Sequence, residues 1–373
     1  MAMRIVADEN ISGVRELCGQ FGPIELVDGR RLASAQLRQA EILLVRSVTR
    51  VDEALLADSP VRFVGSATAG VDHIDVEYLA RREIPFADAA GANAVAVAEY
   101  VVACCLAYCV ATARSPQRLT VGIIGYGHVG TATAQRLRAL GMQVLTNDPP
   151  RAAREGGAHY SALVQALSAD VVSLHVPLTA AGDYPTRALI GAQEIAALAP
   201  RALLINAARG GVLDEAAWLA ALPHRRRLAV DCWCDEPEIN RALLASAWIA
   251  TPHIAGHTVD ARWRATHMLA QAVAQFVGAA AVPSLGPEHS LVSDLRAGDT
   301  VGASLNALVA ECCDPLAWTT EMKRHIALDI PFDQLRRQFG VRREFASYTI
   351  RATALDPASR AAAQALGFRF DER

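Results

Sequence analysis

The sequence predicts an α/β protein with two doubly wound parallel-sheet domains (Rossmann-like or flavodoxin-like) and a small α+β domain at the C-terminal end. Short β-branched runs recur up to residue 253, and helix-length segments separate them. A long apolar helix at 94–113 divides these runs into two series, and the composition changes again after residue 286. The chain has 373 residues, 52 % of them hydrophobic and 20 % charged, which is enough for two or three folded domains.

The expected strands are continuous apolar runs, which is typical of parallel strands that are buried on both faces. The first series comprises 4–8, 24–28, 42–47, 62–67 and 84–88. The second series comprises 120–125, 143–148, 171–176, 202–207, 228–233 and 248–253. Two βα series on either side of one long helix indicate two separate sheets.

The chain is expected to pass between the two sheets twice, first near the helix at 94–113 and again after His253. The predicted domains are therefore 1–95 together with 257–285, then 96–256, then 286–373. The helix at 94–113 is apolar enough to suggest a membrane span. It contains Glu99 and lacks positive flanks, however, so we expect a buried helix.

The C-terminal segment has a different pattern from the two βα series. It starts with two or three expected helices, followed by a strand at 345–353, a helix at 357–366 and a short final strand. A regulatory amino-acid-binding domain would instead have the order βαββαβ. The pattern therefore favours a small α+β domain of another kind.

Charge and composition exclude several classes of protein. The net charge of −3 provides no basic field for nucleic acid. Lys323 is the single lysine, which argues against a lysine Schiff base and leaves arginines or backbone amides to hold an anionic substrate. The eight cysteines form no paired C-x-x-C motifs, so no metal is expected. The N-terminal segment shows no signal-peptide pattern, and we expect a cytoplasmic location with reduced thiols and no membrane partner.

A glycine motif follows the first strand of the second series. Gly125, Gly127 and Gly130 form G-x-G-x-x-G between this strand and a helix at 131–140. Such glycines allow a tight turn, a close approach of the pyrophosphate and close packing of helix on strand. Asp148 ends the next strand, where its carboxylate would accept hydrogen bonds from the adenosine ribose and repel a 2′-phosphate. The motif predicts NAD; the alternative is a structural turn with a helix-capping aspartate.

Three further polar residues each follow a strand of the second series, namely Arg209, Glu236 and His253. The carboxyl ends of parallel strands share one edge of a sheet, where such folds bind ligands. Removing a hydride from a carbon that bears a hydroxyl requires a base, and histidine titrates near working pH. A carboxylate can orient that imidazole, and an arginine can bind a substrate carboxylate with two hydrogen bonds. Each residue alone could be an ordinary loop residue, and His253 with His257 could be a metal pair.

The order of these motifs resembles the D-isomer-specific 2-hydroxyacid dehydrogenases, and within them the 4-phosphoerythronate dehydrogenases. Further segments that carry the resemblance are 6–10, 44–51, 66–75, 93–101, 147–151, 175–179 and 235–240. They extend to about residue 260. The C-terminal segment is similar to the dimerisation domain of that family mainly in its length and at 341–350.

The resemblance implies NAD-dependent oxidation of 4-phosphoerythronate to the 2-oxo acid in vitamin B6 (pyridoxal 5′-phosphate) biosynthesis. It assigns the first domain to the substrate, the second to NAD and the third to a homodimer interface. It makes Arg209 and Glu236 active-site residues and His253 the proton donor and acceptor. Asp148 would bind the adenosine ribose. The other residues implied at the NAD site are Val176, Asn206, Ala207, Ala208, Arg209, Asp231 and Gly256.

The resemblance also implies substrate contacts from Ser47 and Thr68. The family usually has a tyrosine at the position of His257, so this residue changes the reach and charge of one substrate contact. The substrate phosphate requires arginines in a chain with one lysine, and Arg46 beside Ser47 is the first candidate. Arg342 and Arg343 are the second, from a partner subunit, unless they are a solvated surface pair.

Two other functions fit the same motifs. One is another 2-hydroxyacid dehydrogenase, such as a phosphoglycerate dehydrogenase or a glyoxylate/hydroxypyruvate reductase. The other is a non-catalytic NAD-sensing interaction protein that has kept the fold. A turnover assay separates the second from an enzyme, because such a protein can keep all three polar residues.

Overall fold

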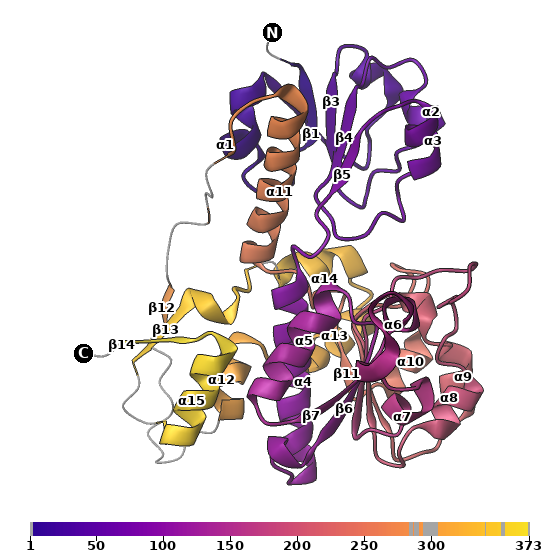
Figure 1. Cartoon of the computed structure of the whole chain (residues 1–373), viewed down its shortest axis with the longest axis vertical. Coiled ribbons are helices and arrows are strands. Elements are labelled where there is room, and N and C mark those ends of the chain that lie inside the picture. Colours follow the sequence, from indigo (N-terminus) through magenta and orange to yellow (C-terminus); the bar gives the residue numbers. More distant parts are fainter. Residues whose placement is uncertain are drawn as a thin grey trace. The chain divides into compact units, whose positions relative to one another are not determined.

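The computed structural model describes residues 3–282, 286, 291–293, 305–339, 341–351 and 355–371 (Figure 1). It consists of two compact units. Unit 1 comprises Met1–Asn93 and Val259–Glu288, and unit 2 comprises Ala94–Thr258 and His289–Arg373. Each unit contains a parallel sheet, which confirms the predicted α/β class.

Unit 1 has a five-stranded parallel sheet in the order β2-β1-β3-β4-β5. Its strands are β1 (Ile5–Asp8), β2 (Ile24–Val27), β3 (Ile42–Val45), β4 (Phe63–Ser66) and β5 (Phe86–Asp88). Its helices are α1 (Val14–Cys18), α2 (Glu53–Leu56), α3 (Val76–Arg81) and α11 (Val259–Val277), with short 3-10 helices at Gly19–Phe21 and Ser34–Leu37.

Successive residues of the unit 1 strands face opposite sides, and both sides are covered. Ile5 and Ala7 of β1 pack in one cluster with α1 and α11, whereas Val6 packs in another with α2 and α3. Figure 1 shows these two pairs of helices on opposite sides of the sheet. The continuous apolar strands are therefore explained by burial on both faces. The strand order reverses between β1 and β3, and such a switch point favours ligand binding at the carboxyl edge.

Unit 2 has a six-stranded parallel sheet in the order β11-β10-β9-β8-β6-β7. Its strands are β6 (Thr120–Ile124), β7 (Gln143–Asn147), β8 (Val171–Leu174), β9 (Leu203–Asn206), β10 (Arg227–Val230) and β11 (Ile249–Ala250). The helices up to β11 are α4 (Ala94–Thr112), α5 (His128–Ala139), α6 (Pro149–Glu155), α7 (Leu163–Leu167), α8 (Ala192–Ala197), α9 (Glu215–Ala220) and α10 (Arg241–Ser246). Short 3-10 helices lie at Pro116–Arg118, Gly157–His159 and Gly210–Val212.

Helix α4 lies in the core of unit 2. Among the described residues it alone is long and apolar enough to cross a membrane, yet 83 % of its most apolar window is buried inside the fold. Its Tyr100 hydroxyl lies 2.7 Å from the Thr251 hydroxyl, and its Tyr108 hydroxyl donates to the Arg201 carbonyl. Helix α4 has apolar residues on all its sides because most of its surface is buried inside unit 2.

The C-terminal part of unit 2 shares a core with the large sheet. It contains β12 (Leu291–Ser293), α12 (Leu305–Cys312), α13 (Pro315–Ala327), α14 (Phe332–Gln338), a 3-10 helix (Phe345–Ser347), β13 (Tyr348–Arg351), α15 (Pro357–Leu366) and β14 (Arg369–Asp371). The three strands form a parallel sheet in the order β12-β13-β14. Helix α13 contacts β11, where the Thr319 hydroxyl accepts a hydrogen bond from the Ala250 N–H.

Two expectations for this segment need correction. It starts with the short strand β12 rather than with helices, and three residues were too few to give a periodic signal. The strand expected at 345–353 begins only at Tyr348, after a 3-10 turn. The all-parallel pairing also differs from a βαββαβ arrangement with its antiparallel pairs.

Candidate active site

The glycine motif forms the turn between β6 and α5, at the point where the strand order of unit 2 reverses. Gly125 has φ +89°, and a Cβ there would lie 2.7 Å from the carbonyl of His175. A Cβ on Gly130 would lie 2.0 Å from the oxygen of Gly125, so this glycine permits helix and strand to pack. Around Gly127, no atom beyond its neighbours in the chain lies within 4 Å of such a Cβ. The open space before the α5 N-terminus fits a pyrophosphate.

Asp148 lies directly after β7 and fixes the same turn. One carboxylate oxygen accepts a hydrogen bond from the Tyr126 N–H at 2.7 Å, within the glycine motif. The other accepts from the Arg151 N–H at 2.8 Å and so caps helix α6. The aspartate therefore caps a helix, as its alternative interpretation required, and also lies beside the open space at Gly127.

The three polar residues follow neighbouring strands at one edge of the sheet. Arg209 follows β9, Glu236 follows β10 and His253 follows β11. The His253 Nδ1 atom lies 2.8 Å and 3.1 Å from the two carboxylate oxygens of Glu236. The Trp233 N–H donates to the same carboxylate at 2.9 Å. The structure thus brings the imidazole and the carboxylate together and fixes the orientation of both.

Burial and charge act in opposite directions on this pair. Burial raises the pKa of Glu236, but the hydrogen bond and the charge of His253 outweigh it, and the net pKa is lowered. Burial lowers the pKa of His253, but Cys232 and Glu236 raise it well above the ordinary value. Burial also raises the pKa of Cys232 and keeps its thiol neutral, so the Glu236 carboxylate is the charge that stabilises an imidazolium.

The loop after β9 orients Arg209 through its own backbone. The buried Asn206 side chain donates to the Arg209 carbonyl at 2.9 Å and accepts from the Ala208 N–H at 3.3 Å. One guanidinium nitrogen of Arg209 donates to the Ala208 carbonyl at 2.8 Å. A Cβ on Gly210 would lie 2.0 Å from the Trp233 carbonyl, so the glycine lets this loop pack against the loop after β10.

Asp231 holds the loop that carries His253. Its buried carboxylate accepts from the Thr251 hydroxyl at 2.7 Å, from the Ile254 N–H at 2.8 Å and from the Ala255 N–H at 3.0 Å. Gly256 and His257 follow in the same loop and are half-buried. Sequence reasoning placed Asp231 at the NAD site and missed these bonds, because only the fold brings the ends of β10 and β11 together.

The expected substrate residues of unit 1 lie at the carboxyl ends of β3 and β4. The Arg46 Nε lies 3.1 Å from a carboxylate oxygen of the buried Asp8, across the switch point between β1 and β3. Ser47 is exposed beside it. The Thr68 hydroxyl donates to the Gly70 carbonyl and lies 2.7 Å from the Ser66 hydroxyl. Asp8 and Ser66 lie in the segments 6–10 and 66–75 that carry the resemblance, but no individual role was expected for either residue.

The second pair of arginines requires a correction. Arg342 is 7 % exposed, and its guanidinium donates to backbone carbonyls of its own chain, so it is not part of a solvated surface pair. Arg343 is half-buried, with a hydrogen bond to the Ser347 hydroxyl. The guanidinium of Arg342 is already hydrogen-bonded within its own subunit, which argues against a contact with the substrate phosphate of a partner subunit.

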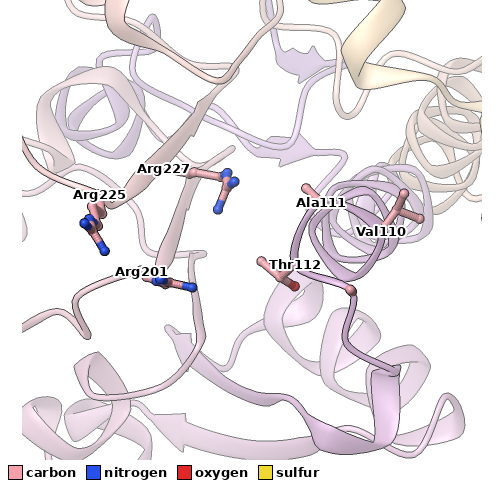
Figure 2. Close-up of a pocket in the computed structure, with 7 residues that line it drawn as sticks. Val110, Ala111, Thr112, Arg201, Arg225 and Arg227 are labelled. Atoms are coloured by element: carbon pink, nitrogen blue, oxygen red, sulfur yellow. The ribbon is translucent and has the colours of Figure 1, made fainter.

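A separate arginine-lined hollow lies at the opposite edge of the unit 2 sheet. Figure 2 shows Arg201, Arg225 and Arg227 around it, near the C-terminal end of α4. Its volume is about 580 Å³. Arg227 begins β10, and Arg201 precedes β9, so the hollow lies at the amino ends of these strands. None of the predicted site residues lines it, so Arg201 is a suitable control position for substitutions at the site.

The fold and these residues define an NAD-dependent dehydrogenase of the 2-hydroxyacid type. Residues 107–255 match the family model of the D-isomer specific 2-hydroxyacid dehydrogenase NAD binding domain. Among solved structures, D-lactate dehydrogenase from Aquifex aeolicus has a TM-score of 0.59 at 23 % identity, covering 74 % of this chain and 95 % of its own. 3-Phosphoglycerate dehydrogenase from Entamoeba histolytica has a TM-score of 0.60 at 23 % identity, with 74 % and 96 % covered. At this identity the likeness shows the fold.

Curated relatives identify the family within this class. Erythronate-4-phosphate dehydrogenase from Hahella chejuensis is 41 % identical, over 92 % of this chain and 93 % of its own. The enzyme of the same name from Marinobacter nauticus is also 41 % identical, over 98 % and 99 %. The chain belongs to the erythronate-4-phosphate dehydrogenase family.

Proposed function

We propose that this enzyme uses NAD to oxidise the C2 hydroxyl of 4-phosphoerythronate to the 2-oxo acid, as a step toward pyridoxal 5′-phosphate. The observation that carries the proposal is the Glu236–His253 pair, which lies at the same edge of an NAD-binding sheet as Arg209. Relatives of that name match nearly the whole chain, including its C-terminal part. The solved lactate and phosphoglycerate dehydrogenases match only about three quarters of this chain, which favours this substrate over lactate or phosphoglycerate.

In this mechanism His253 accepts the proton of the C2 hydroxyl. Its Nδ1 is committed to Glu236, so Nε2 is the nitrogen that takes the proton. Glu236 keeps the ring in one orientation and stabilises the imidazolium that forms. Arg209 binds the substrate carboxylate with its planar fork and polarises the neighbouring oxygen. NAD, when bound at the glycine turn and Asp148, supplies the hydride acceptor.

The substrate-binding part of the proposal rests on unit 1. Ser47 and Thr68 would contact the substrate, and His257 would replace the tyrosine hydroxyl of other family members. Arg46 would bind the phosphate, because it lies at the switch point and is still 31 % exposed despite its ion pair with Asp8. We also propose a homodimer formed through the C-terminal segment and a cytoplasmic location, which eight free thiols support.

The substrate assignment is tested by NADH formation on a panel of 2-hydroxy acids. We expect the highest kcat/KM with 4-phosphoerythronate and a large loss when the phosphate is absent. A preference for 3-phosphoglycerate would assign the chain to the nearest alternative. No turnover with any member of the panel would support a non-catalytic NAD-sensing protein.

The raised pKa of His253 makes a prediction about pH. Oxidation requires a neutral imidazole, so kcat/KM should rise with pH through an apparent pKa above the ordinary histidine value of about 6.5. Glu236→Gln removes the charge that stabilises the imidazolium, and the rising limb should therefore move to lower pH while the maximal rate falls. Rate profiles of both proteins across neutral and alkaline pH measure this shift. An unmoved limb in the variant would show that another group sets it.

Asp148→Ala should relax the preference for NAD over NADP, because it removes the carboxylate that opposes a 2′-phosphate. It should also cost about 1 kcal/mol of stability through loss of the α6 cap. Asp314→Ala is the matched control, since Asp314 caps α13 in the C-terminal part. The ratio of kcat/KM values for the two cofactors is the measurement. An equal ratio in the wild type and Asp148→Ala would place the selecting residue elsewhere.

A further inference from the structure

The C-terminal segment Arg342–Phe345 lies against both places where the chain passes between the units. The first passage is at Asn93–Ala94, just before α4, and the second is at Thr258–Val259. Arg342 and Glu344 are 7 % and 4 % exposed, so the segment is buried within unit 2. Buried charged groups are costly unless they are paired or hydrogen-bonded, so their partners matter.

The guanidinium of Arg342 connects three parts of unit 2. Its Nη2 donates to the carbonyl of Ala96 at 3.2 Å, in the first turn of α4, and to the carbonyl of Ala255. Its Nη1 donates to the Cys313 sulfur at 3.4 Å. The group also lies 6.0 Å from the centre of the Trp318 ring. One side chain therefore holds the start of α4, the loop after β11 and the C-terminal helices together.

The neighbouring residues of the segment hold the same two places. The Phe345 N–H donates to the Glu99 carboxylate on α4 at 2.9 Å. The Thr258 hydroxyl donates to the Glu344 carboxylate at 3.4 Å, at the last residue before the second passage. Burial raises the pKa of Glu99 to about 8, and the nearby Glu344 adds to this rise, whereas the charge of Arg342 opposes it. Arg342 and Glu344 of the segment thus form a buried charged cluster with Glu99 of α4, and the charge of Arg136 on α5 also acts on Glu99.

The loop that Arg342 holds is the one that carries His253. Ala255 lies two residues after His253, and its N–H already donates to Asp231. Its carbonyl accepts a hydrogen bond from Arg342, so both the N–H and the carbonyl of Ala255 are held by hydrogen bonds. His253 itself has φ +56°, a left-handed conformation that a histidine adopts at a cost. Such a conformation persists only where the surrounding contacts impose it.

We propose that Arg342 is a positioning residue for the proton-transfer loop, acting on His253 through the carbonyl of Ala255. The proposal rests on the proposed function, in which His253 takes the substrate proton. Arg342 has no part in the chemistry itself. Its role is to keep the His253 imidazole in hydrogen-bonding position with the Glu236 carboxylate. The C-terminal segment would therefore contribute to catalysis within its own subunit.

The test compares Arg342→Met with Arg342→Lys in the full-length protein. A misplacement of about 1 Å can cost 10²-fold in rate, so we expect kcat of Arg342→Met to fall roughly 10- to 100-fold. NADH affinity should change less than kcat, because the glycine turn and Asp148 are untouched and, of the expected NAD-site residues, only Gly256 and Asp231 belong to or contact this loop. Lysine keeps the charge beside Glu99 and Glu344 but cannot reproduce the planar fork. Arg342→Lys should therefore recover the Tm more completely than kcat.

A second readout needs no substrate. NMR titration of the His253 imidazole should show its pKa moving toward the ordinary histidine value in Arg342→Met, because the contact with Glu236 loosens. Failure of the wild type to turn over any 2-hydroxy acid would overturn the proposed function, whereas an unchanged imidazole pKa would overturn the role of Arg342. Arg360→Met is the matched control, since Arg360 is a C-terminal arginine that lies 5.0 Å from the Phe370 ring.

If Arg342→Met does not fold, two milder substitutions test the same role. Thr258→Val removes the bond to Glu344 with little change in volume, and Arg342→Lys keeps the buried charge. The positioning role predicts a lower kcat and a shifted pH profile in both. If the folded variants keep the kcat and the pH dependence of the wild type, Arg342 serves stability only. The same conclusion follows if the activity falls only in proportion to the fraction of protein that is unfolded.

Discussion

Replacing His253 by asparagine is expected to lower kcat by about 10²- to 10⁴-fold, the usual contribution of a positioned general base. The structure makes this substitution interpretable for two reasons. His253 has φ +56°, and asparagine tolerates this left-handed region better than most residues, so the backbone gains no strain. The loop is also held by Asp231 through the Ile254 and Ala255 N–H groups, which do not involve the imidazole.

The measurements for His253→Asn are kcat, KM and the affinity for NADH. We expect NADH to bind as in the wild type, because the glycine turn lies after β6 and not in this loop. His224→Asn is the control for loss of a histidine, since His224 precedes β10 and therefore lies toward the amino edge of the sheet, opposite to the site. A near-normal kcat in His253→Asn would remove this residue from the mechanism.

The parts of the structure that the sequence predicted are those in which local pattern and chain order suffice. Each strand of the two large sheets begins and ends within two or three residues of its expected range, because strands buried on both faces are continuous apolar runs. The helix expected at 357–366 is α15, with the same bounds. The meeting of Glu236 and His253 follows from order too, since the two residues lie in the loops that follow neighbouring parallel strands.

The missed features depend on contacts between residues far apart in the chain. Arg342 bonds to Ala96, 246 positions away, and nothing local distinguishes it from Arg343. Asp8 pairs with Arg46 only because β1 and β3 are neighbours in the sheet. The strand β12 is too short to show a period and is defined by its pairing with β13. Such features become visible only when the topology is known.

Arg209→Lys is expected to be the second most damaging substitution, although it keeps the positive charge. A guanidinium can donate two parallel hydrogen bonds to a carboxylate, whereas an ammonium is a point charge. Losing one charge-assisted bond costs about 1.5–3 kcal/mol, or roughly 10- to 150-fold in kcat/KM. The loop also fits an arginine, because one guanidinium nitrogen donates to the Ala208 carbonyl and so orients the guanidinium plane of Arg209.

The substitution should change both KM and kcat, because Arg209 would bind the substrate carboxylate before the reaction and polarise the adjacent oxygen during it. Arg201→Lys is the matched control, since Arg201 is an exposed arginine just before the same strand β9, at its opposite end (Figure 2). Arg209→Lys should also discriminate less between 2-hydroxy acids and the corresponding simple alcohols, which lack the carboxylate. If kcat and KM both stayed within about twofold of the wild type, a change too small for loss of a charge-assisted bond, another group would have to hold the carboxylate.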